Sequence, residues 1–192
     1  MQIIRQSAFT ATPWKNGGGI THEAIRVPAS GVAFRWRVSV ARIDVSGPFS
    51  DFAAYHRTMV LLRGNGAALK FANGEERRLH NVGDVAEFDG ALATHCELEN
   101  GPCVDLNLMV AKSLQGVRAG VRRLHEPLPV SAARGRATLI FPIDAPLVLQ
   151  GSGDTAALEP WDLAVIADST GDAVSLVPRA AALVFLATLP ES

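Results

Sequence analysis

Several features that define special classes of protein are scarce in this sequence. It contains only two cysteines, Cys96 and Cys103, which are too few for a disulfide scaffold. A turn at residues 99–101 would let the two thiols meet, whereas the simpler prediction is two reduced, buried thiols. The longest apolar run, residues 180–187, is far shorter than the roughly 20 residues of a membrane helix. Because the amino terminus also lacks a signal-peptide pattern, we expect a cytoplasmic protein without a membrane partner.

Charge of neither sign is in excess. The sequence has 18 Lys and Arg against 19 Asp and Glu, for a formal net charge of -1. This balance provides no general attraction to nucleic acid or to an anionic membrane. Residues 112–136 are basic, but they lack the aromatic side chains on which single-stranded bases stack, so we interpret them as a solvated connection rather than a phosphate or nucleic-acid site. We therefore predict no nucleic-acid partner and expect the function to depend on a local site.

Metal-ligand and nucleophile motifs are also missing. The five histidines are His22, His56, His80, His95 and His125, and no two of them lie two or four positions apart. A metal site on a β-strand usually requires two histidines at alternate positions, because alternate residues share a face. No Gly-x-Ser-x-Gly sequence or comparable nucleophile turn occurs. The sequence therefore predicts no metal, no cofactor and no triad-type hydrolase.

What the sequence contains instead is alternation with a period of two residues. Residues 36–40 and 104–110 alternate apolar with polar or small side chains, which is typical of β-strands. Further segments of this kind cover residues 57–63, 67–71, 137–141, 146–150, 163–167, 174–177 and 183–188. Glycine, asparagine and proline lie between them, as expected for turns. Many short strands joined by frequent turns predict an all-β sandwich or barrel with little helix.

The strand patterns stop near residue 112 and resume near residue 136. Residues 81–88 and 158–165 are also weakly similar, since in each a turn with an aspartate leads into a strand. These features predict two β-units in tandem. The first covers residues 1–112, and residues 113–192 supply a linker and a second, smaller unit.

Two of the predicted strands have an unusual polar face. Arg37 and Ser39 share one face of their strand, Asp105 and Asn107 share one face of theirs, and the opposite faces are apolar. A solvated strand usually carries long polar side chains, whereas short polar residues suit the crowded interior of a small barrel that has to leave room for a ligand. We therefore interpret these faces as the wall of a pocket, and exposure to solvent is the alternative.

The motifs of the first half resemble those of the HutD/Ves family. The most specific run is Trp14-Lys15-Asn16-Gly17-Gly18-Gly19-Ile20-Thr21-His22-Glu23, and the resemblance continues through residues 36–41, 47–50, Arg57, Gly64 and residues 105–109. The second half matches only in length and β character. The sequence departs from the family pattern at residues 53–54 and 88–91, which affects the expected loop shape around Arg57.

The resemblance implies a bicupin, in which a cupin-type, jelly-roll β-barrel is duplicated within one chain. Members of the family are similar to proteins encoded among histidine-utilisation genes. Such proteins are considered to govern the pathway by binding a small anionic intermediate, such as urocanate or a formylated glutamate. No catalytic activity is firmly attached to the family.

On this basis we expect a small carboxylate to bind in the amino-terminal barrel. Arg57 and Arg37 would donate charge-assisted hydrogen bonds to it, and Asp105 would pair with one of these arginines. Trp14 would close the mouth of the barrel or, alternatively, pack in its core. The predicted ligand-binding residues are Trp14, Asn16, Arg37, Ser39, Arg57, Asp105 and Asn107.

Two further functions are compatible with the sequence. One is a metal-free cupin enzyme, an isomerase or lyase, whose general base would be Glu23 or Asp105, with a contribution from His95. The other is an interaction protein that uses its second barrel as a surface for a homodimer. We favour a non-catalytic protein that binds a small anionic metabolite and regulates histidine utilisation.

Overall fold

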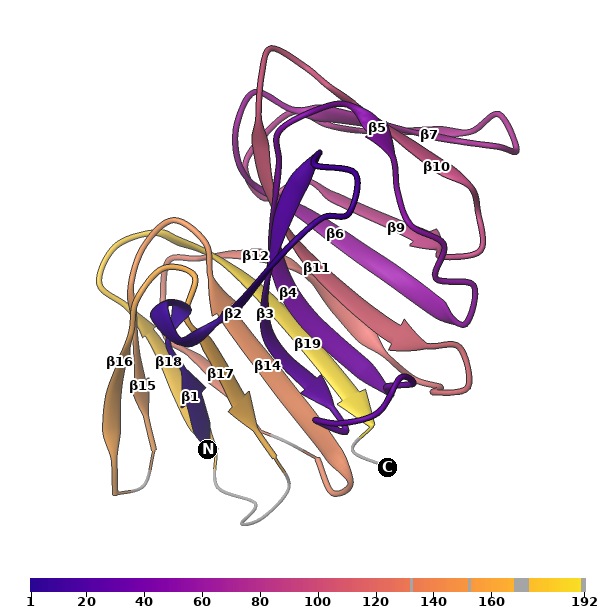
Figure 1. Ribbon diagram of the computed structural model, residues 1–192. Helices are drawn as coiled ribbons and strands as arrows, with labels where there is room; N and C mark the ends of the chain where they lie inside the picture. Colours follow the sequence, from indigo (N-terminus) through magenta and orange to yellow (C-terminus); the bar gives the residue numbers. More distant parts are fainter. Residues whose placement is uncertain (132, 152, 168–172, 191–192) are drawn as a thin grey trace. The chain divides into compact units, whose positions relative to one another are not determined.

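Antiparallel β-strands make up nearly all of the regular structure (Figure 1). The computed structural model describes residues 1–131, 133–151, 153–167 and 173–190. Within these ranges the single helix is one 3-10 turn, η1 (Gln6–Ala8). None of the described helical residues forms a segment long and apolar enough to cross a membrane. The predicted all-β, cupin-type fold with little helix is therefore confirmed.

The chain divides into two units, each built from two antiparallel sheets. The N-terminal unit is Phe9–Leu114, and the C-terminal unit combines Met1–Ala8 with Gln115–Ser192. The expected boundary at residue 112 lies close to this division. The amino terminus differs from expectation, because residues 1–8 join the C-terminal unit through a strand that pairs there.

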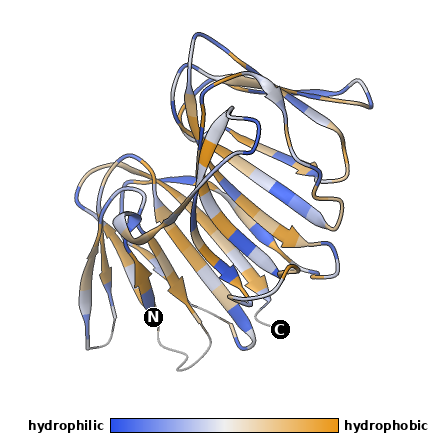
Figure 2. Ribbon diagram, viewed as in Figure 1, coloured by the Kyte–Doolittle hydropathy of each residue, from blue (hydrophilic) through white to orange (hydrophobic). Residues whose placement is uncertain are grey.

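The N-terminal unit has a sheet of six strands and a sheet of four. In order of pairing, the larger sheet contains β2 (Thr10–Pro13), β3 (Gly19–Val27), β4 (Trp36–Ile43), β11 (Cys103–Ala111), β6 (Tyr55–Arg63) and β9 (Val85–Asp89). The smaller sheet contains β5 (Gly47–Pro48), β10 (Thr94–Leu98), β7 (Ala67–Phe71) and β8 (Glu76–Leu79). Figure 2 shows hydrophilic and hydrophobic residues interspersed along the strands of the larger sheet.

Apolar side chains from both sheets meet inside the N-terminal unit. Met59 and Leu61 of β6 pack in one cluster with Leu69 of β7 and the two cysteines. Both thiols are free and buried, as predicted, and burial raises the pKa of each to about 12. This core fills one part of the interior, and the strands of the larger sheet continue beyond it.

The C-terminal unit repeats this architecture with fewer strands. Its larger sheet contains β1 (Gln2–Ile4), β17 (Leu163–Ile166), β14 (Arg136–Pro142), β19 (Ala182–Pro190) and β12 (Arg118–Leu124). Its smaller sheet contains β13 (Leu128–Val130), β18 (Val174–Pro178), β15 (Leu147–Gln150) and β16 (Thr155–Leu158). Leucine, isoleucine, valine and alanine from both sheets form one buried cluster within it.

The segment expected to be a connection contains two strands. β12 and β13 lie within residues 112–136 and pair with β19 and β18. The sequence does not predict β12, because β12 is an edge strand whose arginines are exposed and whose only buried residue is Leu124. An edge strand with one buried side chain lacks the alternation from which the other strands were predicted.

Candidate functional site

A cavity of about 470 Å³ lies within the N-terminal unit. Its wall is the inner face of the six-stranded sheet, closed by the loop after β2 and the segment that follows β5. The polar and charged lining residues are Thr12, Lys15, Asn16, Thr21, Glu23, Arg37, Ser39, Ser50, Arg57, Asp105 and Asn107. The apolar lining comes from Pro13, Trp14, Ala41, Pro48, Phe49, Phe52 and Met109. All seven predicted ligand-binding residues therefore line one cavity.

Strand register explains why two arginines reach this cavity. In one row across the sheet, Arg26 pairs with Arg37, Arg37 with Met109, and Met109 with Arg57. Residues that are paired in neighbouring antiparallel strands point to the same face. Arg37 and Arg57 therefore flank Met109 on the inner face, and Arg37 Nη2 donates to the Met109 Sδ atom at a distance of 3.5 Å.

The polar residues of the cavity occupy the next two rows. The second row contains Glu23, Ser39 and Asn107, and the third contains Thr21, Ala41 and Asp105. On β6, alternation places Arg57 on the same face as Met59 and Leu61, which belong to the apolar core. The cavity is thus a polar continuation of the hydrophobic interior of the barrel.

Arg57 is nearly buried, with 6% of its surface exposed. Its guanidinium carbon lies 4.9 Å from the ring centroids of Phe49 and Phe88 and 5.8 Å from that of Phe52, so cation–π attraction stabilises the charge. Among the described residues no carboxylate oxygen lies within 4.0 Å of it, and its Nε–H has no hydrogen-bond partner. Burial lowers its pKa to about 10, partly offset by attraction to Asp105, which leaves the group cationic at neutral pH.

Arg37 has a different environment. Its Nε atom lies 3.9 Å from the Glu23 Oε2 atom, and its guanidinium carbon lies 5.4 Å from the ring centroids of both Phe34 and Phe52. Burial lowers the pKa of Arg37, while Glu23 raises it and the neighbouring Arg26 lowers it. The positive charge of Arg37 is therefore balanced by a carboxylate that lines the same cavity.

Asp105 does not form the expected close pair with either arginine. In the described structure no oxygen of Asp105 lies within 4.0 Å of a guanidinium nitrogen, and Glu23 is the partner of Arg37 instead. The side chain is almost fully buried at 2% exposure, and Oδ1 has no hydrogen-bond partner. Burial raises the pKa of Asp105 to about 7, even though Arg57 and a hydrogen bond with Asn107 lower it. The physical reason is strand register. Met109 of β11 pairs with both arginines, whereas Asp105 lies two rows further along the same face of β11.

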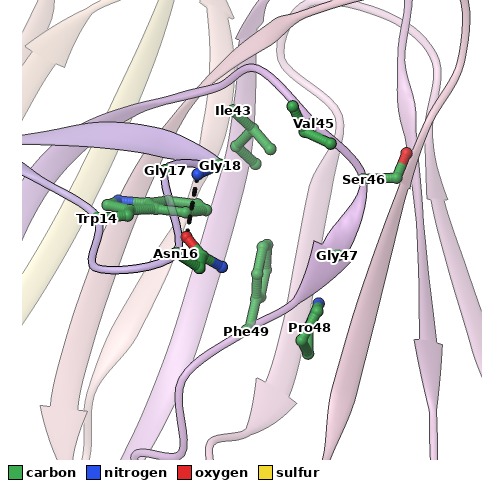
Figure 3. A pocket seen from close by; sticks show the side chains of 10 residues that line it. All are labelled: Trp14, Asn16, Gly17, Gly18, Ile43, Val45, Ser46, Gly47, Pro48 and Phe49. Atoms are coloured by element: carbon green, nitrogen blue, oxygen red, sulfur yellow. Dashed lines mark hydrogen bonds between the residues drawn. The ribbon is translucent and has the colours of Figure 1, made fainter.

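The loop after β2 forms one edge of the cavity and a smaller hollow beside it. The indole N–H of Trp14 donates to Thr21 Oγ1 at 2.8 Å, and the ring meets Phe49 edge to face at 6.2 Å. Asn16 Oδ1 accepts the N–H of Gly18 at 3.0 Å. Trp14 and residues 16–18 also line a hollow of about 150 Å³ together with Ile43 and residues 45–49 (Figure 3). Trp14 thus borders the cavity and also packs against the apolar core, and its expected role in closing the barrel stays a prediction.

Comparison with known proteins assigns the chain to a family. The HutD family model matches residues 6–184. The chain belongs to the HutD family. A curated relative from Pseudomonas putida, described as an uncharacterised 21.2 kDa protein in the hutC 3′ region, is 38% identical over 112 residues. That match spans 58% of the present chain and 58% of the relative, so the chain covers little more than half of the relative's length.

Two solved structures match the HutD-family chain over nearly its whole length. A conserved protein of unknown function from Pseudomonas aeruginosa PAO1 is 28% identical, with a TM-score of 0.89 and 98% of each chain covered. HutD from Pseudomonas fluorescens SBW25, in a structure described as the formate condition, is 25% identical, with a TM-score of 0.80 and 100% and 99% of the two chains covered. Membership of this family links the chain to histidine utilisation.

One other sequence candidate, His95, lies outside this cavity. His95, considered as an accessory catalytic group, is exposed on β10 and borders a separate groove of about 470 Å³ with Lys70 and Phe71. Over residues 1–131, 133–151, 153–167 and 173–190, no three His, Cys, Asp or Glu side chains gather as a metal site would require. The absence of a bound metal in the purified protein therefore stays a prediction, to be checked by elemental analysis of untagged protein.

The sequence does not indicate that aromatic rings lie against the guanidinium groups of Arg37 and Arg57. Phe49 belonged to a motif of the resemblance but received no role, and Phe88 was noted only as part of a departure from the family pattern. Phe52 and Phe34 carried no signal, because aromatic residues in loops are common and their ring contacts arise from chain segments that are distant in sequence.

Proposed function

We propose that this protein binds a small carboxylate in the cavity of its N-terminal unit and does so without chemical turnover. Arg57 is the principal anion-binding group, Arg37 assists it, and Ser39 and Asn107 orient the ligand. Trp14 and Asn16 border the opening on the side of the loop after β2.

The observation that carries this proposal is the buried charge of Arg57, which has no carboxylate within 4.0 Å among the described residues. A cation removed from water is costly unless an anion accompanies it. The aromatic rings around Arg57 offset part of this cost, but no carboxylate of the described chain lies within 4.0 Å. A ligand carboxylate would supply the missing counter-charge and accept two parallel hydrogen bonds from the guanidinium fork.

The pathway context comes from the family. We propose that the protein regulates histidine utilisation in the cytoplasm by sensing an anionic intermediate such as urocanate or formylglutamate. This rests on membership of the HutD family and on the location of the Pseudomonas putida relative beside hutC. The volume of about 470 Å³ suits a ligand of this size.

Thermal unfolding in the presence of urocanate and formylglutamate tests the binding proposal. A ligand that binds only the folded state raises the melting temperature in a concentration-dependent way. Arg57→Gln should weaken binding about 10- to 150-fold, because a charge-assisted hydrogen bond contributes roughly 1.5–3 kcal/mol. Arg77→Gln is the matched control, since Arg77 is exposed and forms a surface ion pair with the neighbouring Glu75. Equal stabilisation of wild type and Arg57→Gln would contradict the proposal.

One observation favours an enzyme as the second candidate. Asp105 is a buried carboxyl that lines the cavity with a pKa of about 7 and an unpartnered oxygen, and these properties suit a general base. Incubation of the purified protein with the pathway acids, followed by chromatography, separates the two functions. Turnover that is lost in Asp105→Asn would establish the enzyme, and ligand-induced stabilisation without turnover would establish the binding protein.

A further inference from the structure

The segment between β5 and β6 closes one side of the cavity. We call its residues 48–52 the aromatic strap, because they include Phe49 and Phe52. Both phenylalanines are partly buried, whereas the other three residues of the strap are exposed. The strap therefore contributes to the interior of the unit mainly through its two rings.

Hollow space lies on both sides of the aromatic strap. Pro48, Phe49 and Ser50 line the cavity and also line the groove of about 470 Å³ that His95 borders. Phe49 additionally borders the hollow of about 150 Å³ beside Trp14 (Figure 3). A segment that is hollowed on both faces has few packing contacts, so it opens locally at a much smaller free energy than the unit needs to unfold.

Backbone contacts attach the aromatic strap to its neighbours. β5 pairs with β10 over two residue pairs. Beyond β5, the N–H of Phe49 donates to the Thr94 carbonyl at 2.9 Å, and the N–H of Phe52 donates to the Gly90 carbonyl at 3.1 Å. Position 90 requires glycine, because a Cβ atom there would clash with the carbonyl oxygen of Phe52. Contacts of this kind break and form again when a short segment opens.

Rings from the strap and from a strand contact the same guanidinium group. The Arg57 guanidinium carbon lies 4.9 Å from the ring centroids of both Phe49 and Phe88. Phe88 belongs to β9 and is held by the pairing of β9 with β6, whereas Phe49 belongs to the strap. The Phe52 ring centroid lies 5.8 Å from the same carbon and 5.4 Å from that of Arg37. Cation–π attraction therefore holds the strap against both arginines.

We propose that the aromatic strap is a lid, which opens toward the groove beside His95 to admit a ligand to Arg57 and closes again over the bound ligand. This inference rests on the proposed carboxylate-binding function and adds the route by which the ligand enters. Arg57 is only 6% exposed while the strap is in place. Because the lid has to open before the ligand enters and again before it leaves, opening sets both the association and the dissociation rate.

Phe49 and Phe52 hold the lid closed, and their replacement tests its role. Phe49→Leu and Phe52→Leu keep an apolar side chain but lose the ring contact with the guanidinium groups. Each should raise the association and dissociation rate constants by about tenfold, with a smaller change in the dissociation constant. Phe88→Leu is the matched control, because it removes a ring at the same distance from Arg57 but outside the strap. It should raise the dissociation rate constant and leave the association rate constant unchanged.

The rate constants are measured with the two acids of the proposed function. Stopped-flow tryptophan emission follows formylglutamate, since Phe49 meets the Trp14 ring at 6.2 Å. Ligand NMR line shapes follow urocanate, which absorbs ultraviolet light itself. Hydrogen exchange with mass spectrometry examines the wild-type lid without any substitution. In the free protein the amides of the strap should exchange faster than those of β6 and β10, and ligand binding should slow them.

The outcomes separate the lid from the proposed function. Equal protection of the strap and β10 in the free protein would overturn the inference and leave carboxylate binding intact. Identical rate effects of Phe49→Leu, Phe52→Leu and Phe88→Leu would do the same. Failure of wild type to bind either acid would overturn the proposed function, and the role of the lid with it.

Discussion

At the scale of single residues, the cavity is defined by charges that are largely buried. Three phenylalanine rings lie within 6 Å of the guanidinium carbon of Arg57, which is 6% exposed, so an anion that binds it interacts in a medium of lower dielectric constant than water. Burial also acts on Asp105, and there it shifts the pKa into the neutral range. Its burial favours the neutral acid, which reduces the repulsion that a carboxylate ligand would meet.

The raised pKa of Asp105 predicts a specific dependence of stability on pH. Its pKa is about 7 in the folded protein against an ordinary value of 3.8, so between these values the folded state binds more protons than the unfolded state. The free energy of unfolding should therefore fall as the pH rises from about 4 to about 7 and should level off above that. Asp105→Asn should be more stable than wild type at pH 8 by about 2–4 kcal/mol, and the difference should disappear below about pH 4.

Urea unfolding of both proteins at several pH values checks this prediction. Asp105→Asn mimics the protonated carboxyl, so its stability should lack the decline between pH 4 and pH 7. Parallel pH profiles for the two proteins would show that Asp105 titrates normally. Carboxylate binding by wild type should also strengthen as the pH falls through 7, because neutral Asp105 no longer repels the ligand.

At the scale of strands, close approach of the backbone shapes the entrance of the cavity. A Cβ atom on Gly19 would clash with the carbonyl oxygen of Arg42 and would lie 3.2 Å from the ring of Trp14. The first contact is to the backbone of β4, which cannot move away without breaking the pairing of β3 with β4. Glycine at this position therefore lets Trp14 lie flat against the start of β3.

We expect Gly19→Ala to lower the free energy of unfolding by about 1–3 kcal/mol, because it overpacks a closely fitted site. The variant should also change the fluorescence of Trp14, since the ring has to shift. Gly47→Ala is the control, because a Cβ there meets no atom within 4 Å. Chemical denaturation with tryptophan emission as the signal measures both effects, and identical behaviour of the two variants would contradict this account.

At the scale of the whole molecule, the first residues of the chain complete the C-terminal unit. β1 pairs with β17, and Arg5 Nη1 lies 2.7 Å from the Asp162 Oδ2 atom. The backbone N–H of Gln6 donates to Asp162 Oδ1 at 2.9 Å. Asp162 is buried, so the removal of these partners leaves a carboxylate without most of its compensation.

Deletion of residues 1–8 should therefore destabilise the C-terminal unit by about 3 kcal/mol or more. Limited proteolysis with mass spectrometry should locate the new cleavage sites in residues 115–190, while carboxylates should still stabilise the N-terminal unit against heat. Arg5→Ala should have a smaller effect of the same kind. Arg42→Ala, which removes an exposed surface pair with Asp44, should change little. Cleavage confined to residues 9–114 would contradict this division of the chain.

Much of the fold could be predicted because alternation is a local signal. The segment expected at residues 67–71 is β7 with the same bounds, and the one expected at 104–110 is β11 to within one residue. β12 escaped prediction because an exposed edge strand has no need of alternating apolar residues. β1 escaped because three residues carry too little pattern, and its partner lies far away in the chain.

The sequence by itself determined the β class and the polar residues of two strand faces, since these depend on neighbours in the chain. Only the tertiary structure decided how those residues interact. The pairing of β3, β4, β11 and β6 sets Arg37 and Arg57 in one row, and Asp105 two rows away. It therefore places Glu23, not Asp105, beside Arg37. Cross-strand register and bulges depend on the packing of the whole barrel, so the partners of a charge cannot be read from the alternation within its own strand.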